Sequence, residues 1–324
     1  MLPHKRYALP RLQRTAVDEF ELIQTCFVSS DEGAGVVTGI GDDGAVLRPD
    51  YGRELVTVVD TLVAGTHFPD SIDAGDIGYR AVAVNLSDIA AMGARPRWMT
   101  LALTLPNADS AWVHRFAQGL RAAAAPYDVS LVGGDTTSGD CLVVTVQITG
   151  DIEAGRALHR AGAVVGDTIF VTGTLGDAAA GLELLVAGTP NKYLASRFLR
   201  PAARVEYGQR LVGHASAAID VSDGLFGDLQ KLLIASGVGG VIELGQLPVS
   251  TELMTIFTVD EQRRLALAGG DDYELCFTGP AHNLPDCDGL TVTAIGEITS
   301  QAGLVCRDHG VVVPYHDSGY RHFQ

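Results

Sequence analysis

Short runs of β-branched and aliphatic residues alternate with longer segments of helical periodicity in the first half of the chain. Two segments place apolar residues at helical spacing: 76–92, which stops before Gly93, and 110–125, which stops before Pro126. Four short apolar runs have the composition of strands: residues 55–59, 98–105, 129–132 and 142–149. The pattern predicts an alternation of strands and helices that is typical of α/β and α+β proteins.

The same alternation returns after about residue 155. Expected strands lie at residues 168–172, 215–221, 241–244, 273–278 and 291–298, and expected helices at 177–186, 202–212 and 225–235. A chain of 324 residues is longer than one typical core holds, so two α/β domains are favoured. We expect a loose extension over residues 1–17, an N-terminal domain over 18–152 and a C-terminal α/β domain over 153–324.

The composition narrows the class of protein and of partner. A net charge of −16 argues against nonspecific binding to nucleic acid or to an anionic membrane. No apolar run of 18 residues occurs, and no apolar segment follows the basic start of the chain, so we expect a cytoplasmic protein that is neither exported nor membrane-spanning. The five cysteines are widely spaced and form no CxxC pair, which indicates reduced thiols rather than disulfides or a zinc site.

Aspartate stands beside or near glycine in several short segments that follow or interrupt apolar runs. Burying an unpaired carboxylate costs several kcal/mol, so such residues need a compensating cation. The repetition of this pattern suggests that the protein binds several hard metal ions. Proteins usually bind several such ions together in order to bind a polyphosphate. The segments are GDDG at 41–44, VDT at 59–61, LSD at 86–88, GGDT at 133–136, IDVSDG at 219–224 and GGDD at 269–272.

Asp60 and Asp88 are the clearest candidates for metal ligands. Asp60 is expected at the exit of the buried strand 55–59, and Asp88 lies in a helix that is apolar nearly all round. Asn85, three residues before Asp88, shares its helix face and would offer a second oxygen donor. The alternative is a buried aspartate that accepts hydrogen bonds from backbone amides, as buried polar groups commonly do.

Two glycine-containing segments would combine phosphate and metal binding. Gly133 and Gly134 follow an expected strand and would let backbone N–H groups approach a phosphate while Asp135 holds a bridging cation. The segment 220–224 repeats the arrangement in the second half, where Gly224 would permit a sharp turn into the expected helix at 225–235. The GGD segment alone is also compatible with an ordinary turn. Arg160 would reach a phosphate bidentately, but a solvated surface arginine is the commoner case.

Familiar nucleotide motifs are missing or do not fit. The sequence GIGDDG at 39–44 has the spacing of a dinucleotide fingerprint, but its two carboxylates would face the pyrophosphate and Pro49 soon forbids a helix. An acidic β-turn is its simple alternative. The chain has neither a P-loop nor the motifs of protein kinases.

Seven blocks, in order, resemble the thiamine-monophosphate kinase family and span the chain from about Phe20 to Phe323. The second and third blocks and the last one go beyond features shared with related families such as aminoimidazole ribonucleotide synthetase, selenophosphate synthetase and formylglycinamidine synthase. The blocks are GIGDD at 39–43, DTLVAGTHF at 60–68, AVNLSDIAAMGA at 83–94, GGDTT at 133–137, TGTLGD at 172–177, IDVSDGL at 219–225 and GYRHF at 319–323.

The resemblance implies an aminoimidazole ribonucleotide synthetase-like fold with an N-terminal mixed sheet that pairs into a homodimer. It also implies Mg²⁺-dependent transfer of the γ-phosphoryl group of ATP to thiamine monophosphate, the final step of thiamine diphosphate formation. The Mg²⁺ ligands would be Asp43, Asp60, Asp88, Asp135, Asp220 and Asp223. Contacts to ATP would come from Gly134, Asp135, Arg160 and Ser222. The thiamine monophosphate site would be lined by His67, Asp271 and Tyr320.

Two positions depart from the family pattern. Val59 stands where relatives often carry a threonine that helps to bind metal, and Asp271 stands where glutamate is usual. Two rival functions stay open at this point. An ATP-dependent amidine cyclase or synthetase would act on formylglycinamidine ribonucleotide but not on thiamine monophosphate. A non-catalytic metal- or nucleotide-binding protein would bind ATP without releasing ADP.

The expected chemistry suits these residues. Phosphoryl transfer requires alignment and charge neutralisation and little covalent work by side chains. The acceptor is itself a phosphate, ionised at neutral pH, so no general base is needed. We therefore expect direct in-line transfer without a phosphoenzyme.

Overall fold

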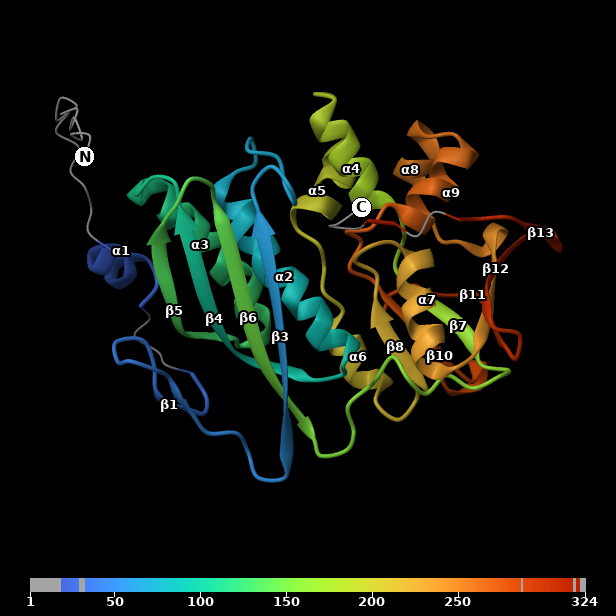
Figure 1. Cartoon of the computed structure of the whole chain (residues 1–324), viewed down its shortest axis with the longest axis horizontal. Helices are drawn as coiled ribbons and strands as arrows, with labels where there is room; N and C mark the ends of the chain where they lie inside the picture. The colour runs from blue at the N-terminus through green and yellow to red at the C-terminus, as the bar shows by residue number, and fades with distance from the viewer. Residues whose placement is uncertain (1–18, 29–32, 287, 317–318, 321–324) are drawn as a thin grey trace, which may run out of the picture.

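A computed structural model describes residues 19–28, 33–286, 288–316 and 319–320. The expected extension at 1–17 and the last three positions of the GYRHF block lie outside these residues. Figure 1 shows two lobes side by side, each a sheet with its helices, joined where β6 leads into β7. No helix in the described ranges is long and apolar enough to cross a membrane.

The N-terminal lobe is built on a four-stranded mixed sheet of order β3-β6-β4-β5, in which only β4 and β5 run parallel. Helices α2 and α3 cover one face of this sheet (Figure 1). A short helix, α1, and a two-stranded hairpin precede the sheet. The elements are α1 Glu19–Cys26, β1 Val36–Thr38, β2 Val46–Leu47, β3 Arg53–Val63, α2 Ala74–Ala91, β4 Arg95–Leu105, α3 Ser110–Ala124, β5 Ser130–Ser138 and β6 Val143–Glu153.

The C-terminal lobe contains a seven-stranded sheet of order β13-β12-β9-β11-β7-β10-β8, antiparallel except between β12 and β9. Its helices surround this sheet (Figure 1). The strands are β7 Thr168–Thr172, β8 Ala217–Asp220, β9 Gly239–Glu243, β10 Leu275–Gly279, β11 Val292–Thr299, β12 Gly303–Asp308 and β13 Val311–Val313. The helices are α4 Asp177–Val186, α5 Lys192–Leu199, α6 Val205–Leu211, α7 Leu225–Ser236, α8 Thr251–Ile256 and α9 Val259–Ala268.

Helix α2 is the central element of the junction between the lobes. The Asp73 side chain caps its start by accepting a hydrogen bond from the Gly75 N–H, and Gly93, with φ of 69°, lies just beyond its C-cap. It contacts β3 and β6 on one side and α5, α6, β8 and β10 on the other. One hydrophobic core therefore extends from the N-terminal sheet through α2 to Phe198 and Phe277 of the other lobe. A helix buried on nearly all sides explains its nearly uniform apolar sequence.

Two expectations about strand ends are wrong. Asp60 lies inside β3, three residues before its last residue, and not at the exit of a strand that ends at residue 59. Gly133, Gly134 and Asp135 lie within β5 and pair with β4; they do not form a loop after it. Both strands continue because their neighbours in the sheet supply ladder hydrogen bonds to Asp and Gly residues that local propensity disfavours.

Candidate functional site

Three aspartates from different elements approach each other at the junction between the lobes. Asp60 comes from β3, Asp88 from the last turns of α2, and Asp220 from the end of β8. Asp60 and Asp88 are hydrogen-bonded to each other, and Asp220 lies close enough to influence the ionisation of both. We call these three residues the acidic cluster. The ionised carboxylates repel one another, so the cluster is suited to hold positive charge.

Burial and mutual repulsion disfavour ionisation in the acidic cluster. Burial, reinforced by the carboxylates of Asp220 and Asp60, raises the pKa of Asp88 to about 8. Burial also raises the pKa of Asp220 to about 7, although Ser87 donates a hydrogen bond of 2.8 Å to it. The pKa of Asp60 is raised for the same primary reason. A cation between these groups would restore their ionised forms.

The loop after β8 is organised by a further carboxylate. Asp228 of α7 accepts hydrogen bonds from the backbone N–H groups of Ser222 and Asp223, both 2.9 Å long. Lys231 donates to Asp223 at 2.7 Å and to Asp228 at 2.8 Å. Gly224, with φ of 123°, makes the turn into α7 that the sequence predicted. Asp223 therefore has a cationic partner in Lys231.

Arg160 and Asn85 lie near the acidic cluster, the first exposed and the second buried. Arg160 is exposed, and its charge lowers the pKa of both Asp88 and Asp220. Asn85 is fully buried; its amide nitrogen donates 3.0 Å to the Ala81 carbonyl, while its side-chain oxygen has no hydrogen-bond partner. That oxygen is therefore available to bind a cation, which is the role that the sequence predicted for Asn85.

A second group of predicted residues lines a separate cavity of about 530 Å³. Asp43 comes from the loop at 39–45, and Gly134 and Asp135 come from β5. Apolar side chains of Ile40 and Leu131 also line this cavity. Gly134 has a φ of 159°, and a Cβ there would lie 2.0 Å from the Leu101 carbonyl oxygen, so only glycine fits. A mixed apolar and polar cavity of this size suits a nucleotide-sized ligand.

Asp60 and Asp135 lie on opposite faces of the N-terminal sheet. Asp60 pairs across the ladder with Val146, which is buried beneath the helices. Asp135 belongs to the other face, together with Thr137, which shares a 3.1 Å hydroxyl contact with Thr104. Three strand spacings of about 4.8 Å also separate the edge strands β3 and β5. One chain in this conformation therefore does not bring Asp135 to the acidic cluster.

The three residues expected to line the acceptor site lie in different settings. His67 is in the turn after β3, where its Nδ1 accepts a 3.0 Å hydrogen bond from the Val63 N–H. Tyr320 is half exposed, and its N–H donates 3.1 Å to the Asp223 carbonyl. Asp271 forms an ion pair with Arg80 of α2. Asp271 and Tyr320 are thus attached to the loop after β8, whereas His67 belongs to the turn after β3.

Sequence reasoning missed Arg80, Ser87 and Lys231, which contact the predicted carboxylates. Arg80 and Ser87 are seven residues apart on one helix, so they share a face of α2. Arg80 was a usable signal in the sequence, because a charged residue within an apolar helix needs a partner. Lys231 gave no comparable signal, since lysine on a helix usually faces solvent.

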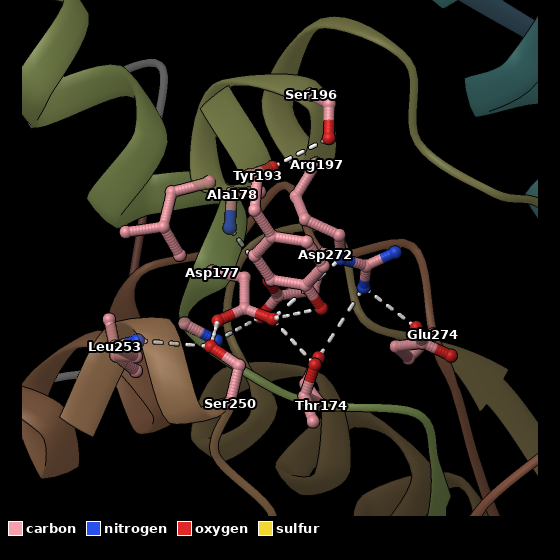
Figure 2. A network of polar contacts seen from close by, with 12 residues as sticks. Thr174, Asp177, Ala178, Tyr193, Ser196, Arg197, Ser250, Leu253, Asp272 and Glu274 are labelled. Atoms are coloured by element: carbon pink, nitrogen blue, oxygen red, sulfur yellow. Dashed lines mark hydrogen bonds and ion pairs between the residues drawn. The ribbon is translucent and has the colours of Figure 1, made fainter. Parts of the chain in front are cut away.

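Behind Asp271, the next residues are fixed by a buried ionic network (Figure 2). Asp272 accepts hydrogen bonds from the N–H groups of Gly176 and Ala178 at the start of α4, of 2.7 and 3.2 Å. Glu274 is fully buried and pairs with Arg197 of α5 and with Arg204. Buried groups joined by several hydrogen bonds and ion pairs hold a segment in one conformation.

Oxygen donors of the acidic cluster match the preference of Mg²⁺ for carboxylates. Within the described ranges, no group of three or more His, Cys, Asp or Glu side chains is arranged to enclose an ion by itself. Mg²⁺ commonly keeps several waters and takes one or two carboxylates together with phosphate oxygens of the substrate. The donor set therefore fits an ion that arrives with a phosphate ligand.

Comparisons with known proteins agree with this architecture. The chain matches the AIR synthase related protein family, its N-terminal domain over residues 41–152 and its C-terminal domain over 164–309. A thiamine-monophosphate kinase from Salmonella typhimurium is 46% identical over an alignment 323 residues long, and the alignment covers 95% of this chain and 99% of that protein.

Solved structures extend the similarity to three dimensions. The crystal structure of thiamine-monophosphate kinase from Stenotrophomonas maltophilia K279a has a TM-score of 0.81 and 44% identity, covering 86% of this chain and 93% of that one. The structure of AaThiL complexed with AMPPCP and TMP has a TM-score of 0.77 and 33% identity, covering 97% and 99%. The resemblance found in the sequence blocks and the two-domain fold that it implied are confirmed, and the chain belongs to the thiamine-monophosphate kinase family.

Proposed function

We propose that the protein transfers the γ-phosphoryl group of ATP to thiamine monophosphate and releases thiamine diphosphate and ADP. The observation that carries this proposal is the acidic cluster, built from both lobes at their junction in a chain of this family. The complex of AaThiL with AMPPCP, an ATP analogue, and TMP supports both substrates, because that protein shares 33% of this sequence.

In this proposal, Asp60, Asp88 and Asp220 would hold Mg²⁺, with Asp223 nearby once Lys231 releases it. Mg²⁺ would supply charge neutralisation for two phosphate groups that otherwise repel each other. Arg160, exposed beside the cluster, would bind phosphate oxygens through its guanidinium, and the Ser222 hydroxyl would add a further contact to ATP.

The cavity beside β5 would hold another part of ATP. Asp43 and Asp135 would reach metal ions at its edge, and Gly134 would let the backbone approach the nucleotide. Asp271, His67 and Tyr320 remain our proposed lining of the thiamine monophosphate site. The carboxylates would need no covalent role, so we propose direct in-line transfer between the two phosphates.

We also propose a homodimer formed through the face of the N-terminal sheet that α2 and α3 leave open. Hydroxyl pairs such as Thr61 with Thr145 lie on this face, and Leu55 and Val59 there are 52% and 61% exposed. A second copy would cover these apolar residues and bring its own Asp135 to the interface. We propose the lobes 18–152 and 153–324 as the two domains of each subunit.

The test is an assay of ADP and thiamine diphosphate formed from ATP and thiamine monophosphate. We expect equal amounts of both products, loss of turnover with chelator, and no reaction with free thiamine. Absence of thiamine diphosphate with ATP binding intact would refute the proposal. Labelling from γ-labelled ATP that stays on the protein and is chased into product would refute direct transfer.

A further inference from the structure

Arg80 of α2 is a buried cation that reaches across the junction between the lobes. Its side chain is 3% exposed, and its guanidinium lies 4.2 Å from the ring centroid of Phe198 and 5.5 Å from that of Tyr273. It donates one hydrogen bond of 2.5 Å to the Phe198 carbonyl and another to the carboxylate of Asp271. Each of these partners belongs to the C-terminal lobe.

The segment held by Arg80 is bonded directly to the loop after β8. The Asp271 N–H donates 2.8 Å to the Ser222 carbonyl, and the Tyr273 N–H donates 2.9 Å to the Val221 carbonyl. Asp271 and Tyr273 have φ values of 62° and 52°, a backbone region that non-glycine residues adopt only when their surroundings impose it. A displacement of Asp271 therefore moves the loop that follows Asp220.

Helix α2 has a second contact with the same loop. Ser87 lies two helical turns after Arg80 and donates 2.8 Å to Asp220. Two contacts on one helix face fix both the distance and the tilt of α2 relative to this loop. Asp88 directly follows Ser87, so the pair of contacts also sets its separation from Asp220.

We propose that Arg80 is a positioning residue for phosphoryl transfer, which fixes the separation of Asp88 and Asp220 across the junction by holding Asp271. The proposal deepens the proposed function and rests on it, since the cluster is taken as the place of transfer. It also gives Asp271 a second task beside the expected contact with substrate. An error of about 1 Å in such a site can cost about 100-fold in rate.

The chemistry at this position calls for arginine rather than lysine. The planar guanidinium donates in two directions, to a carbonyl and to a carboxylate, while it stacks between two aromatic rings. A lysine ammonium would keep the charge but would not reproduce this flat, forked geometry. The variant Arg80→Lys should therefore restore only part of what Arg80→Met removes.

A matched control is available in a second arginine that contacts α2. Arg200 also joins the C-terminal lobe to α2, through a 2.6 Å ion pair with Asp76, and its guanidinium lies 5.4 Å from the Tyr79 ring centroid. It is 51% exposed, and among the described residues its ion pair is with Asp76 and not with Asp271. The variant Arg200→Met removes an ion pair across the junction without touching the Arg80 contact.

The experiment compares the full-length wild type with Arg80→Met, Arg80→Lys, Asp271→Asn and Arg200→Met by steady-state kinetics. We expect Arg80→Met and Asp271→Asn to lower kcat by about 10- to 100-fold, Arg80→Lys to fall between, and Arg200→Met to match wild type. Asp271→Asn keeps a hydrogen-bond acceptor at a partly exposed position, so it remains informative if Arg80→Met does not fold. Wild-type kcat in folded Arg80→Met or in Asp271→Asn would overturn the proposal, as would a rise in KM for thiamine monophosphate with kcat unchanged.

A second readout separates this proposal from the proposed function. Calorimetric titration with Mg²⁺ and AMPPCP needs no turnover and reports on the cluster directly. We expect weaker binding to Arg80→Met than to wild type and unchanged binding to Arg200→Met. If wild type lacks kinase activity, the proposed function fails while this comparison still decides whether Arg80 positions the cluster; equal binding by wild type and Arg80→Met would count against it.

Discussion

At the scale of single residues, ionisation of the buried carboxylates in the acidic cluster destabilises the folded state. Asp88 ionises with a pKa of about 8, raised first by burial and then by its carboxylate neighbours. A carboxylate whose pKa is raised in the folded state destabilises the fold above its unfolded pKa. The ionised Asp88 therefore does not stabilise the fold, as expected for the metal ligand that we propose.

We predict that Asp88→Asn lowers kcat by about 100-fold or more while the free energy of unfolding stays equal to that of wild type or rises. Asparagine keeps the shape and removes the charge that its neighbours repel. The measurements are kcat at saturating Mg²⁺ and urea unfolding without Mg²⁺. Asp76→Asn is the control, because Asp76 is a partly exposed carboxylate on the same helix whose 2.6 Å ion pair is with Arg200. An unchanged rate would refute Asp88 as a metal ligand.

The sequence predicted individual residues better than their grouping. Asp88 was recognisable because its helix is apolar all round, and Asp220 because it ends a buried strand. Nothing in the local sequence showed that Asp60 faces the helices while Asp135 faces the open side of the sheet, since both were expected at strand ends. The register of β3 and β5 against their neighbouring strands decides which face of the sheet each side chain occupies. Local sequence patterns do not encode this register.

At the scale of elements, the position of α2 depends on its close crossing with α3. A Cβ at Gly78 would lie 2.1 Å from the Phe116 carbonyl oxygen, and one at Gly119 would lie 1.8 Å from the Gly75 carbonyl oxygen. Both contacts involve backbone atoms, which cannot rotate away. The two glycines thus allow α2 to pack against α3 while its other side faces the C-terminal lobe.

We predict that Gly78→Ala lowers the free energy of unfolding by about 1–3 kcal/mol, because overpacking outweighs the gain in helix propensity of about 1 kcal/mol. Urea unfolding of the whole chain measures this. Gly245→Ala is the control, since nothing lies within 4 Å of a Cβ at that position. Equal stability of Gly78→Ala and Gly245→Ala would show that the crossing of α2 and α3 is looser than described.

Helix boundaries near strong breakers were well predicted, and other elements were missed. The strand at 168–172 and the helix at 177–186 have the predicted bounds. Helices α5, α8 and α9 were not predicted, although α9 begins with a capping box of Thr258 and Glu261. Helices α5 and α9 pack against α4, and α8 packs against α5 and α9. Short helices are marginal without such contacts.

At the scale of the whole molecule, the site requires both lobes at once. Asp60 and Asp88 come from the N-terminal lobe, and Asp220 and Asp223 from the C-terminal lobe. A ligand that binds all of them favours the folded arrangement of the two lobes over any state in which they separate.

We predict that Mg²⁺ with AMPPCP stabilises the whole chain against unfolding, by about 2.7 kcal/mol at a ligand concentration 100 times the dissociation constant. The measurement is urea unfolding followed by a probe in each lobe, because a ligand bound across the junction should shift both transitions together. Chelator should abolish the effect. A shift confined to one lobe would contradict a shared site.

The Mg²⁺ concentration that gives half-maximal formation of thiamine diphosphate tests the central claim most directly. It should be measured for wild type, Asp88→Asn and Asp220→Asn under saturating ATP and thiamine monophosphate. We predict a higher requirement and a lower maximal rate in both variants, because carboxylates from the two lobes hold the same ions. Wild-type Mg²⁺ dependence and rate in either variant would contradict the account.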